Sequence, residues 1–215
     1  MAYRHLDELR ADWRQTHAEI DRRLAEFRRL RTAKDERVFA ELAFCLFAIQ
    51  TSARRSEAAV RELVARDLLW RGTVAEVAHM LRRHVRFHNH KAAYLAAARG
   101  RFAGSPGTFR RQLDAFADAS KAREWLVREI DGFGYKEASH FLRNVGRGED
   151  LAILDRHVLK NLRRHGILRS IPDSLPPRRY LEIEGNVRRF AQAVDIPMAA
   201  LDLVFWSRET GEVFK

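Results

Sequence analysis

The stretch Ile130-Asp-Gly-Phe-Gly-Tyr135 lies between two segments with helical periodicity, at about 120–130 and 135–145. Two glycines within three residues allow the backbone to turn tightly, because glycine lacks the Cβ atom that restricts other residues. The sequence therefore predicts two helices that are joined by a short hairpin at Gly132 and Gly134.

Helical periodicity extends outward from this hairpin along nearly the whole chain. Apolar residues recur three and four positions apart, and no useful stretch alternates apolar and polar residues as a strand does. We expect an all-α protein of about ten helices, with a turn at Gly104–Gly107 and a capping box at Thr73-Val-Ala-Glu76. The expected helices cover about 6–30, 35–50, a segment after 56 to about 66, a segment opened at 73, 89–102, 109–117, 120–130, 135–145, a segment after 155, 178–194 and a segment after 197.

The composition excludes several classes of protein. The 215 residues carry 40 Lys and Arg against 29 Asp and Glu, a net charge of +11, which favours a polyanionic partner such as nucleic acid. One cysteine excludes a disulfide framework and a cysteine-rich metal site. No apolar run approaches a membrane span and no signal peptide is visible, so we expect a soluble cytoplasmic protein. His84, His88 and His90 have no acidic partner nearby in the sequence, and we expect no metal and no cofactor.

The hairpin also carries a chemical indication. Backbone amides at the start of a helix attract anions, so a glycine hairpin that leads into a helix can hold a DNA phosphate. Gly132 and Gly134 are therefore candidate DNA-binding residues in a helix-hairpin-helix motif. Glycine turns between helices are also common without any DNA-binding role, so this feature alone leaves both readings open.

Lys136 follows the hairpin directly, in the first turn of the next helix. The chain has 34 arginines and only six lysines, so a lysine at this position indicates a role that arginine could not fill. An amine can form a Schiff base and a guanidinium cannot, which makes Lys136 a candidate nucleophile. A phosphate-contacting or solvated lysine is the alternative.

Asp155 follows the apolar run Leu151-Ala-Ile-Leu154 and opens a helix. An aspartate at this place is usually an N-cap. A carboxylate that is held there and faces Lys136 would also stabilise a positively charged sugar or help to move protons.

Two segments around these residues closely resemble the helix-hairpin-helix DNA glycosylases: GFGYKEASHFLRNVG at 132–146 and DLAILDRHVLK at 150–160. Within that superfamily the chain resembles the archaeal-type (type 2) 8-oxoguanine DNA glycosylase/AP lyases. ELAFCLFAIQTSARRSEAAV at 41–60, VRFHNHKAAYL at 85–95 and the ending LDLVFWSRETGEVFK support the resemblance. The single cysteine cannot build the iron–sulfur cluster of the endonuclease-III-like and adenine-glycosylase branches.

The resemblance implies a role for each motif residue. Lys136 would attack C1′ of the damaged nucleotide, expel the base and form a Schiff base that allows β-elimination. Asp155 matches the catalytic aspartate. Arg86 and Phe87 would wedge the DNA, although a phosphate contact and a core position are alternatives. Gln50 would contact DNA or cap a helix end.

The end of the chain implies lesion recognition. In the resembled family the C-terminal lysine, here Lys215, reaches the pocket and contacts the oxidised guanine. 8-Oxoguanine has an N7–H donor where guanine has an acceptor, and a carbonyl or carboxylate would pair with it. Trp206 would stack on the flipped base or lie in the core.

We therefore expect a two-lobed helix-hairpin-helix DNA glycosylase fold with a cleft between the lobes. One lobe would be a helical barrel at 52–154, with the hairpin motif at about 120–146. Residues 1–51 and 155–215 would form the second lobe. The expected function is excision of 8-oxoguanine from duplex DNA followed by strand nicking, by a nucleoid-associated monomer. A glycosylase for another damaged base and a non-catalytic DNA-binding module are the alternatives.

Overall fold

The computed structural model describes residues 3–102 and 108–215, and within them the chain forms twelve helices and no strand. The predicted all-α class is confirmed. The turn expected at Gly104–Gly107 lies outside the described residues. In chain order the helices are α1 (Leu6–Leu30), α2 (Asp35–Phe47), α3 (Ala53–Ala65), α4 (Leu68–Arg71), α5 (Val74–Leu81), α6 (His88–Phe102), α7 (Thr108–Asp114), α8 (Ala119–Glu129), α9 (Tyr135–Asn144), α10 (Arg156–Arg164), α11 (Pro177–Val194) and α12 (Met198–Thr210).

Most helix ends lie within a few residues of their expected positions. The capping box at α5 is confirmed: Thr73 Oγ1 accepts from Glu76 N at 3.3 Å, and the Glu76 carboxylate accepts from Thr73 N at 2.8 Å. Helix α3 begins at Ala53, so the start expected at Ser56 was wrong. The Ser56 hydroxyl lies inside the helix and donates to the Ser52 carbonyl at 3.0 Å.

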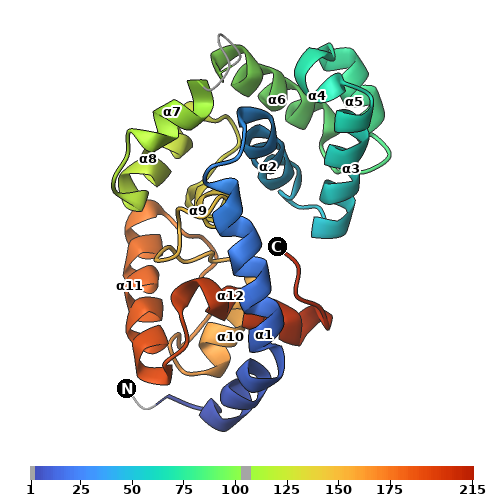
Figure 1. Ribbon diagram of the computed structural model, residues 1–215. Coiled ribbons are helices and arrows are strands. Elements are labelled where there is room, and N and C mark those ends of the chain that lie inside the picture. The colour runs from blue at the N-terminus through green and yellow to red at the C-terminus, as the bar shows by residue number, and fades with distance from the viewer. Residues whose placement is uncertain (1–2, 103–107) are drawn as a thin grey trace.

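The buried apolar side chains form two separate cores. The first surrounds α2, whose residues 41–47 are all buried, and receives side chains from each of the helices α3 to α9. The second gathers side chains of α1 and of α10 to α12. Figure 1 shows α3 to α6 above this second group of helices, and α1 rising from the bottom of the view toward α2. The domain limits at 52 and 154 stay a prediction. Helix α2, which lies before residue 52, packs with α3 to α9 in the first core.

Besides the connection from α1 to α2, the chain passes between the two cores at two places. Leu151 is buried in the first core and Ala152 in the second, so the segment that precedes α10 crosses from one to the other. Near the end of the chain Val213 is buried in the second core and Phe214 in the first. Both crossings adjoin residues that the sequence singles out, Asp155 and Lys215.

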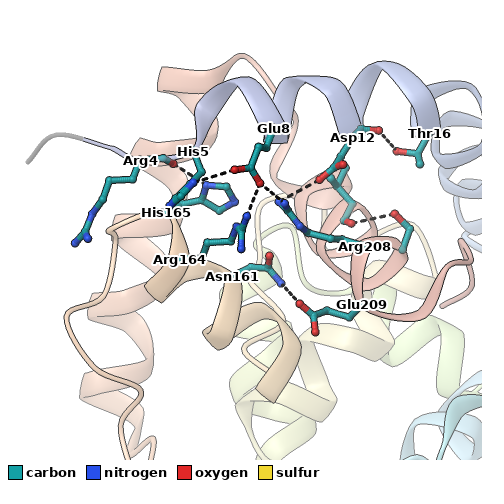
Figure 2. A network of polar contacts seen from close by, with 12 residues as sticks. Arg4, His5, Glu8, Asp12, Thr16, Asn161, Arg164, His165, Arg208 and Glu209 are labelled. Carbon is teal, nitrogen blue, oxygen red and sulfur yellow. Dashed lines mark hydrogen bonds and ion pairs between the residues drawn. The ribbon is translucent and has the colours of Figure 1, made fainter.

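A polar network fastens α1 to the helices of the second core (Figure 2). The Glu8 carboxylate of α1 accepts hydrogen bonds from Arg164 of α10 and, at 2.5 Å, from Arg208 of α12. Arg208 also pairs with Asp12 at 3.1 Å. Hydrogen bonds from Arg164 and Arg208 lower the pKa of Glu8 to about 2, so this carboxylate stays charged near neutral pH.

None of the described helices is long and apolar enough to cross a membrane.

Candidate active site

The predicted hairpin lies between α8 and α9. Gly132 has a φ of +86°, a conformation that favours glycine, and a Cβ atom there would lie 2.8 Å from the ring of Tyr94. Phe133 is buried and its amide donates to the Ile130 carbonyl at 3.1 Å, which closes the turn. The hairpin therefore requires glycine at 132 for both conformation and space.

Lys136 stands in the first turn of α9, as predicted, and its amine is partly exposed. The Nζ atom lies 3.1 Å from Glu137 Oε1, and the Lys136 side chain is 27% exposed. The other carboxylate oxygen, Oε2, accepts a hydrogen bond from the amide of Gly134 at 3.2 Å. In this structure the amine pairs with Glu137 and not with Asp155. This carboxylate does not stand out in the sequence, because a glutamate in the first turn of a helix has an ordinary capping role.

Asp155 is the N-cap of α10, as predicted. Its Oδ1 atom accepts from Val158 N at 2.8 Å. The segment before it is held by a side chain of α11: the Tyr180 hydroxyl donates to the Ala152 carbonyl at 2.6 Å and accepts from Leu154 N at 3.2 Å. The aspartate thus projects from a firmly held backbone.

A buried ion pair connects this segment to the helix that carries Lys136. The Arg123 guanidinium of α8 donates to both carboxylate oxygens of Glu184 in α11, at 2.6 and 3.0 Å. Glu184 also accepts from the amide of Ala152 at 2.8 Å. Arg123 lies 4.8 Å from the ring centre of Tyr135, which directly precedes Lys136. The Arg123–Glu184 pair therefore contacts Tyr135, directly before Lys136, and Ala152, three residues before Asp155.

His140 lies one turn after Lys136 on α9. Burial lowers the pKa of His140 well below its ordinary value, and the charges of Arg143, Lys136 and Lys215 act in the same direction. The imidazole is therefore neutral near pH 7. Its Nε2 atom is buried without a hydrogen-bond partner.

The residues predicted to contact the DNA helix lie on two loops that the structure brings together. Gln50 follows α2 and Phe87 precedes α6, and both have positive φ values, of 52° and 57°. Left-handed backbone is uncommon for residues with a Cβ atom and tends to occur at functional sites. Phe87 is 50% exposed, and the Arg86 guanidinium lies 5.4 Å from the centre of its ring.

Lys91 connects the two loops through hydrogen bonds of its side-chain amine. Its amine, buried to 2% exposure, donates to the carbonyls of Phe47 and Ile49 at 2.7 Å each and to Thr51 Oγ1 at 3.0 Å. Thr51 Oγ1 also accepts from the amide of Arg86 at 3.2 Å. Burial lowers the pKa of Lys91 to about 8, and the charges of Arg86 and Lys136 contribute.

Lys215 reaches the first core with its side chain. Its Nζ atom lies 3.0 Å from a Glu41 oxygen and 2.8 Å from a Glu57 oxygen, and 4.3 Å from the ring centre of Phe44. Lys215, Glu41 and Glu57 line a cavity of about 340 Å³. Trp206, half-buried in α12, packs edge-on against His157, with ring centres 5.0 Å apart. Its Nε1 atom has no hydrogen-bond partner.

One of the three histidines, His84, has an acidic partner that lies far from it in the sequence. Glu62 accepts from His84 Nε2 at 2.7 Å, although the two residues lie 22 positions apart. Among the residues that the structure describes, no three His, Cys, Asp or Glu side chains are arranged to hold a metal ion.

Comparison with known proteins places this arrangement in a family. The model of the family described as 8-oxoguanine DNA glycosylase matches residues 20–196. The chain belongs to the 8-oxoguanine DNA glycosylase family. It is 35% identical to the 8-oxoguanine DNA glycosylase/AP lyase of Fusobacterium nucleatum over 98% of each chain. It is 38% identical to that of Methanocaldococcus jannaschii over 91% of each.

Solved structures of family members agree with this assignment. The structure of the Methanocaldococcus jannaschii 8-oxoguanine glycosylase/lyase in complex with 15mer DNA containing 8-oxoguanine matches with a TM-score of 0.89 and 34% identity. The match covers 98% of this chain and 99% of that one. The 8-oxoguanine DNA glycosylase of Thermotoga maritima matches with a TM-score of 0.88 over 98% of each chain. The glycosylase fold that the sequence predicts is confirmed.

Proposed function

We propose that this family member excises 8-oxoguanine from duplex DNA and then nicks the strand at the resulting abasic site. The observation that carries the proposal is the partly exposed amine of Lys136, at the start of α9 directly after the glycine hairpin, in a chain that belongs to this family. An amine there can attack C1′ of a nucleotide whose phosphate is held by the hairpin amides. The net charge of +11 supports a DNA partner.

The other site residues take roles that fit their positions. Asp155, fixed as the N-cap of α10, stabilises the positive charge that develops on the sugar when the base leaves. Gln50, Arg86 and Phe87 enter the duplex where the damaged nucleotide has left the stack, and Gly132 and Gly134 hold the backbone. Lys215 and Trp206 recognise the base after it has flipped out of the stack. A main-chain oxygen of Lys215 accepts a hydrogen bond from its N7–H group.

The proposed protein acts as a monomer on one lesion at a time, and DNA binding would place it on the nucleoid. Light scattering of the protein alone and bound to a duplex with one lesion tests the monomer. A mass of two chains in both samples would contradict it.

Borohydride trapping tests the reaction. Wild type is mixed with a duplex that carries one 8-oxoguanine, beside an undamaged duplex and beside Lys136→Gln. A covalent adduct that only wild type forms, and only on the lesion, supports both the Schiff base and the substrate. Binding without an adduct would contradict the proposal, and trapping on duplexes with other damaged bases would then separate a different glycosylase from a binding module.

A further inference from the structure

The carboxylate of Glu137 occupies an unusual place for its position in the sequence. Consecutive residues on a helix project in different directions, so Lys136 and Glu137 would not ordinarily face each other. They do so here because Glu137 folds back over the hairpin, where Oε2 accepts from the amide of Gly134 at 3.2 Å. That hydrogen bond turns Oε1 toward the Lys136 amine, 3.1 Å away.

Gly134 leaves room for this arrangement. Its φ of −105° is available to any residue, so backbone conformation does not require glycine at this position. A Cβ atom at 134 would, however, lie 3.3 Å from Glu137 Oε2, closer than ordinary van der Waals contact. A side chain there would push the carboxylate away from both the amide and the amine.

A second capping box in the same chain shows what a purely structural glutamate does. Glu76 uses a single oxygen, Oε2, to accept from both the amide and the hydroxyl of Thr73, at 2.8 and 2.7 Å. Among the residues that the structure describes, Glu76 has no lysine partner. Glu137 divides its two oxygens between the cap and the amine, and its side chain is only 14% exposed. Both glutamates therefore cap a helix, and of these two only Glu137 also contacts a lysine.

The groups around the amine from other elements do not offer a proton acceptor. Lys91 from α6 and Lys215 near the chain end are cationic groups. The Cys45 thiol of α2 is buried and burial raises its pKa well above the ordinary value, so it holds its proton. His140 on α9 is neutral, and Arg143 is cationic. Asp155 caps α10 through Oδ1, and among the described residues the ion pair of the Lys136 amine is with Glu137 and not with Asp155. Glu137 is the carboxylate in contact with the amine.

We propose that Glu137 is a further catalytic residue, which takes the proton from the Lys136 ammonium so that the amine can attack C1′. The proton moves from Nζ to Oε1, and the electrons of the N–H bond remain on nitrogen as the lone pair that forms the bond to C1′. The electrons of the C1′–base bond leave with the base, which takes up a proton from water, and Glu137 then releases its own proton to water. The inference rests on the proposed function, since it requires Lys136 to be the nucleophile.

The geometry allows two roles for Glu137 that predict opposite results. A proton acceptor speeds the reaction, and a glutamine in its place slows it. A mere counter-ion stabilises the charged and unreactive ammonium, so that a glutamine speeds the reaction or leaves it unchanged. Glutamine retains an oxygen that can accept from the Gly134 amide, which preserves the cap in either case.

The experiment compares wild type, Glu137→Gln and Glu76→Gln by single-turnover nicking of an 8-oxoguanine duplex and of an abasic-site duplex between pH 6 and 9. General bases contribute about 10²- to 10⁴-fold, and part of that contribution remains with water as the acceptor. We expect Glu137→Gln to be about 10- to 100-fold slower at pH 6.5, with the deficit shrinking as hydroxide becomes available. Glu76→Gln should react at the wild-type rate.

Two results would overturn the inference. One is a nicking rate of Glu137→Gln that equals or exceeds the wild-type rate at every pH, which would show that Glu137 is only a counter-ion. The other is a loss of rate in Glu137→Gln that has the same size at every pH, which would show that the substitution only displaces Lys136. Failure of the proposed function is distinguishable, because wild type would then form no borohydride adduct on either duplex.

Discussion

Arg123 and Glu184 lie 61 positions apart and form a two-fold hydrogen-bonded ion pair with only 1% and 4% of their side chains exposed. The pair joins α8 of the first core to α11 of the second. Because Glu184 also accepts from the amide of Ala152 and Arg123 lies over the ring of Tyr135, the pair fixes the backbone on both sides of the candidate site.

Removal of one partner should therefore be costly. Glu184→Gln leaves a buried guanidinium without its counter-charge, and we expect a loss of about 3–5 kcal/mol in the free energy of unfolding. The exposed pair of Arg23 and Glu26 offers a control, and Glu26→Gln should cost less than about 1 kcal/mol. Denaturant unfolding measures both. Equal losses in the two variants would contradict a special role of the buried pair.

Lys91→Met should disturb both DNA-contact loops at once. The substitution leaves the carbonyls of Phe47 and Ile49 and the hydroxyl of Thr51 without their charged donor, and hydrogen bonds to charged groups contribute about 1.5–3 kcal/mol. We expect the Kd for a duplex with an abasic-site analogue to rise at least about tenfold. The exposed Lys34, at the opposite end of α2, gives a control, and Lys34→Met should bind nearly as wild type. An unchanged Kd for Lys91→Met would show that the loops keep their shape without the amine.

Asp202 should make stability depend on pH between about 4 and 6. Burial raises its pKa from 3.8 to about 6, despite Arg143 at 3.1 Å. The folded chain then binds a proton that the unfolded chain has already lost in this range, so the contribution of Asp202 to the free energy of unfolding falls as pH rises from about 4 to about 6.

The difference in unfolding free energy between wild type and Asp202→Asn isolates this group. We expect that difference to shift against wild type as pH rises from 4 to 6.5, and to stay constant above that value. A difference that does not change over the range would contradict a raised pKa.

Lys215→Met should slow the excision of 8-oxoguanine, which requires recognition of the base, more than the nicking of an abasic site. Its amine is held by Glu41 and Glu57, and without those ion pairs the main chain at 215 loses its anchor. Excision of 8-oxoguanine should fall at least about tenfold, while nicking of an abasic site, which has no base to read, should stay within about threefold of wild type. Single-turnover rates on the two duplexes test this. A parallel loss on both would place Lys215 in the chemistry common to the two steps.

Short-range patterns predict the helices, the glycine hairpin and the caps at Thr73 and Asp155, because each depends on residues within one or two turns. Helix α4 has four residues, too few to show a period, and it was missed. The start of α3 was misplaced because Ser56 resembles a cap and lies one turn inside the helix.

Contacts between distant segments could not be predicted in the same way. Nothing in the sequence pairs Arg123 with Glu184, places Lys91 under two loops or joins His84 to Glu62, since each contact depends on how helices pack. The carboxylate beside Lys136 is adjacent in the sequence, but its direction depends on the hydrogen bond to Gly134. Roles for the site residues follow from the resemblance and stay predictions until the variants are measured.

The crossing at Leu151 and Ala152 also bears on how the enzyme matures. Lys136 belongs to a helix of the first core and Asp155 to a segment of the second, and contacts between residues 32 and 61 positions apart bring them into register. Such long-range contacts form late, because the entropy of closing a long loop must be met first. A nascent chain with one core complete would hold only one of the two candidate catalytic residues in place, so the proposed strand nicking would begin only after both cores have folded.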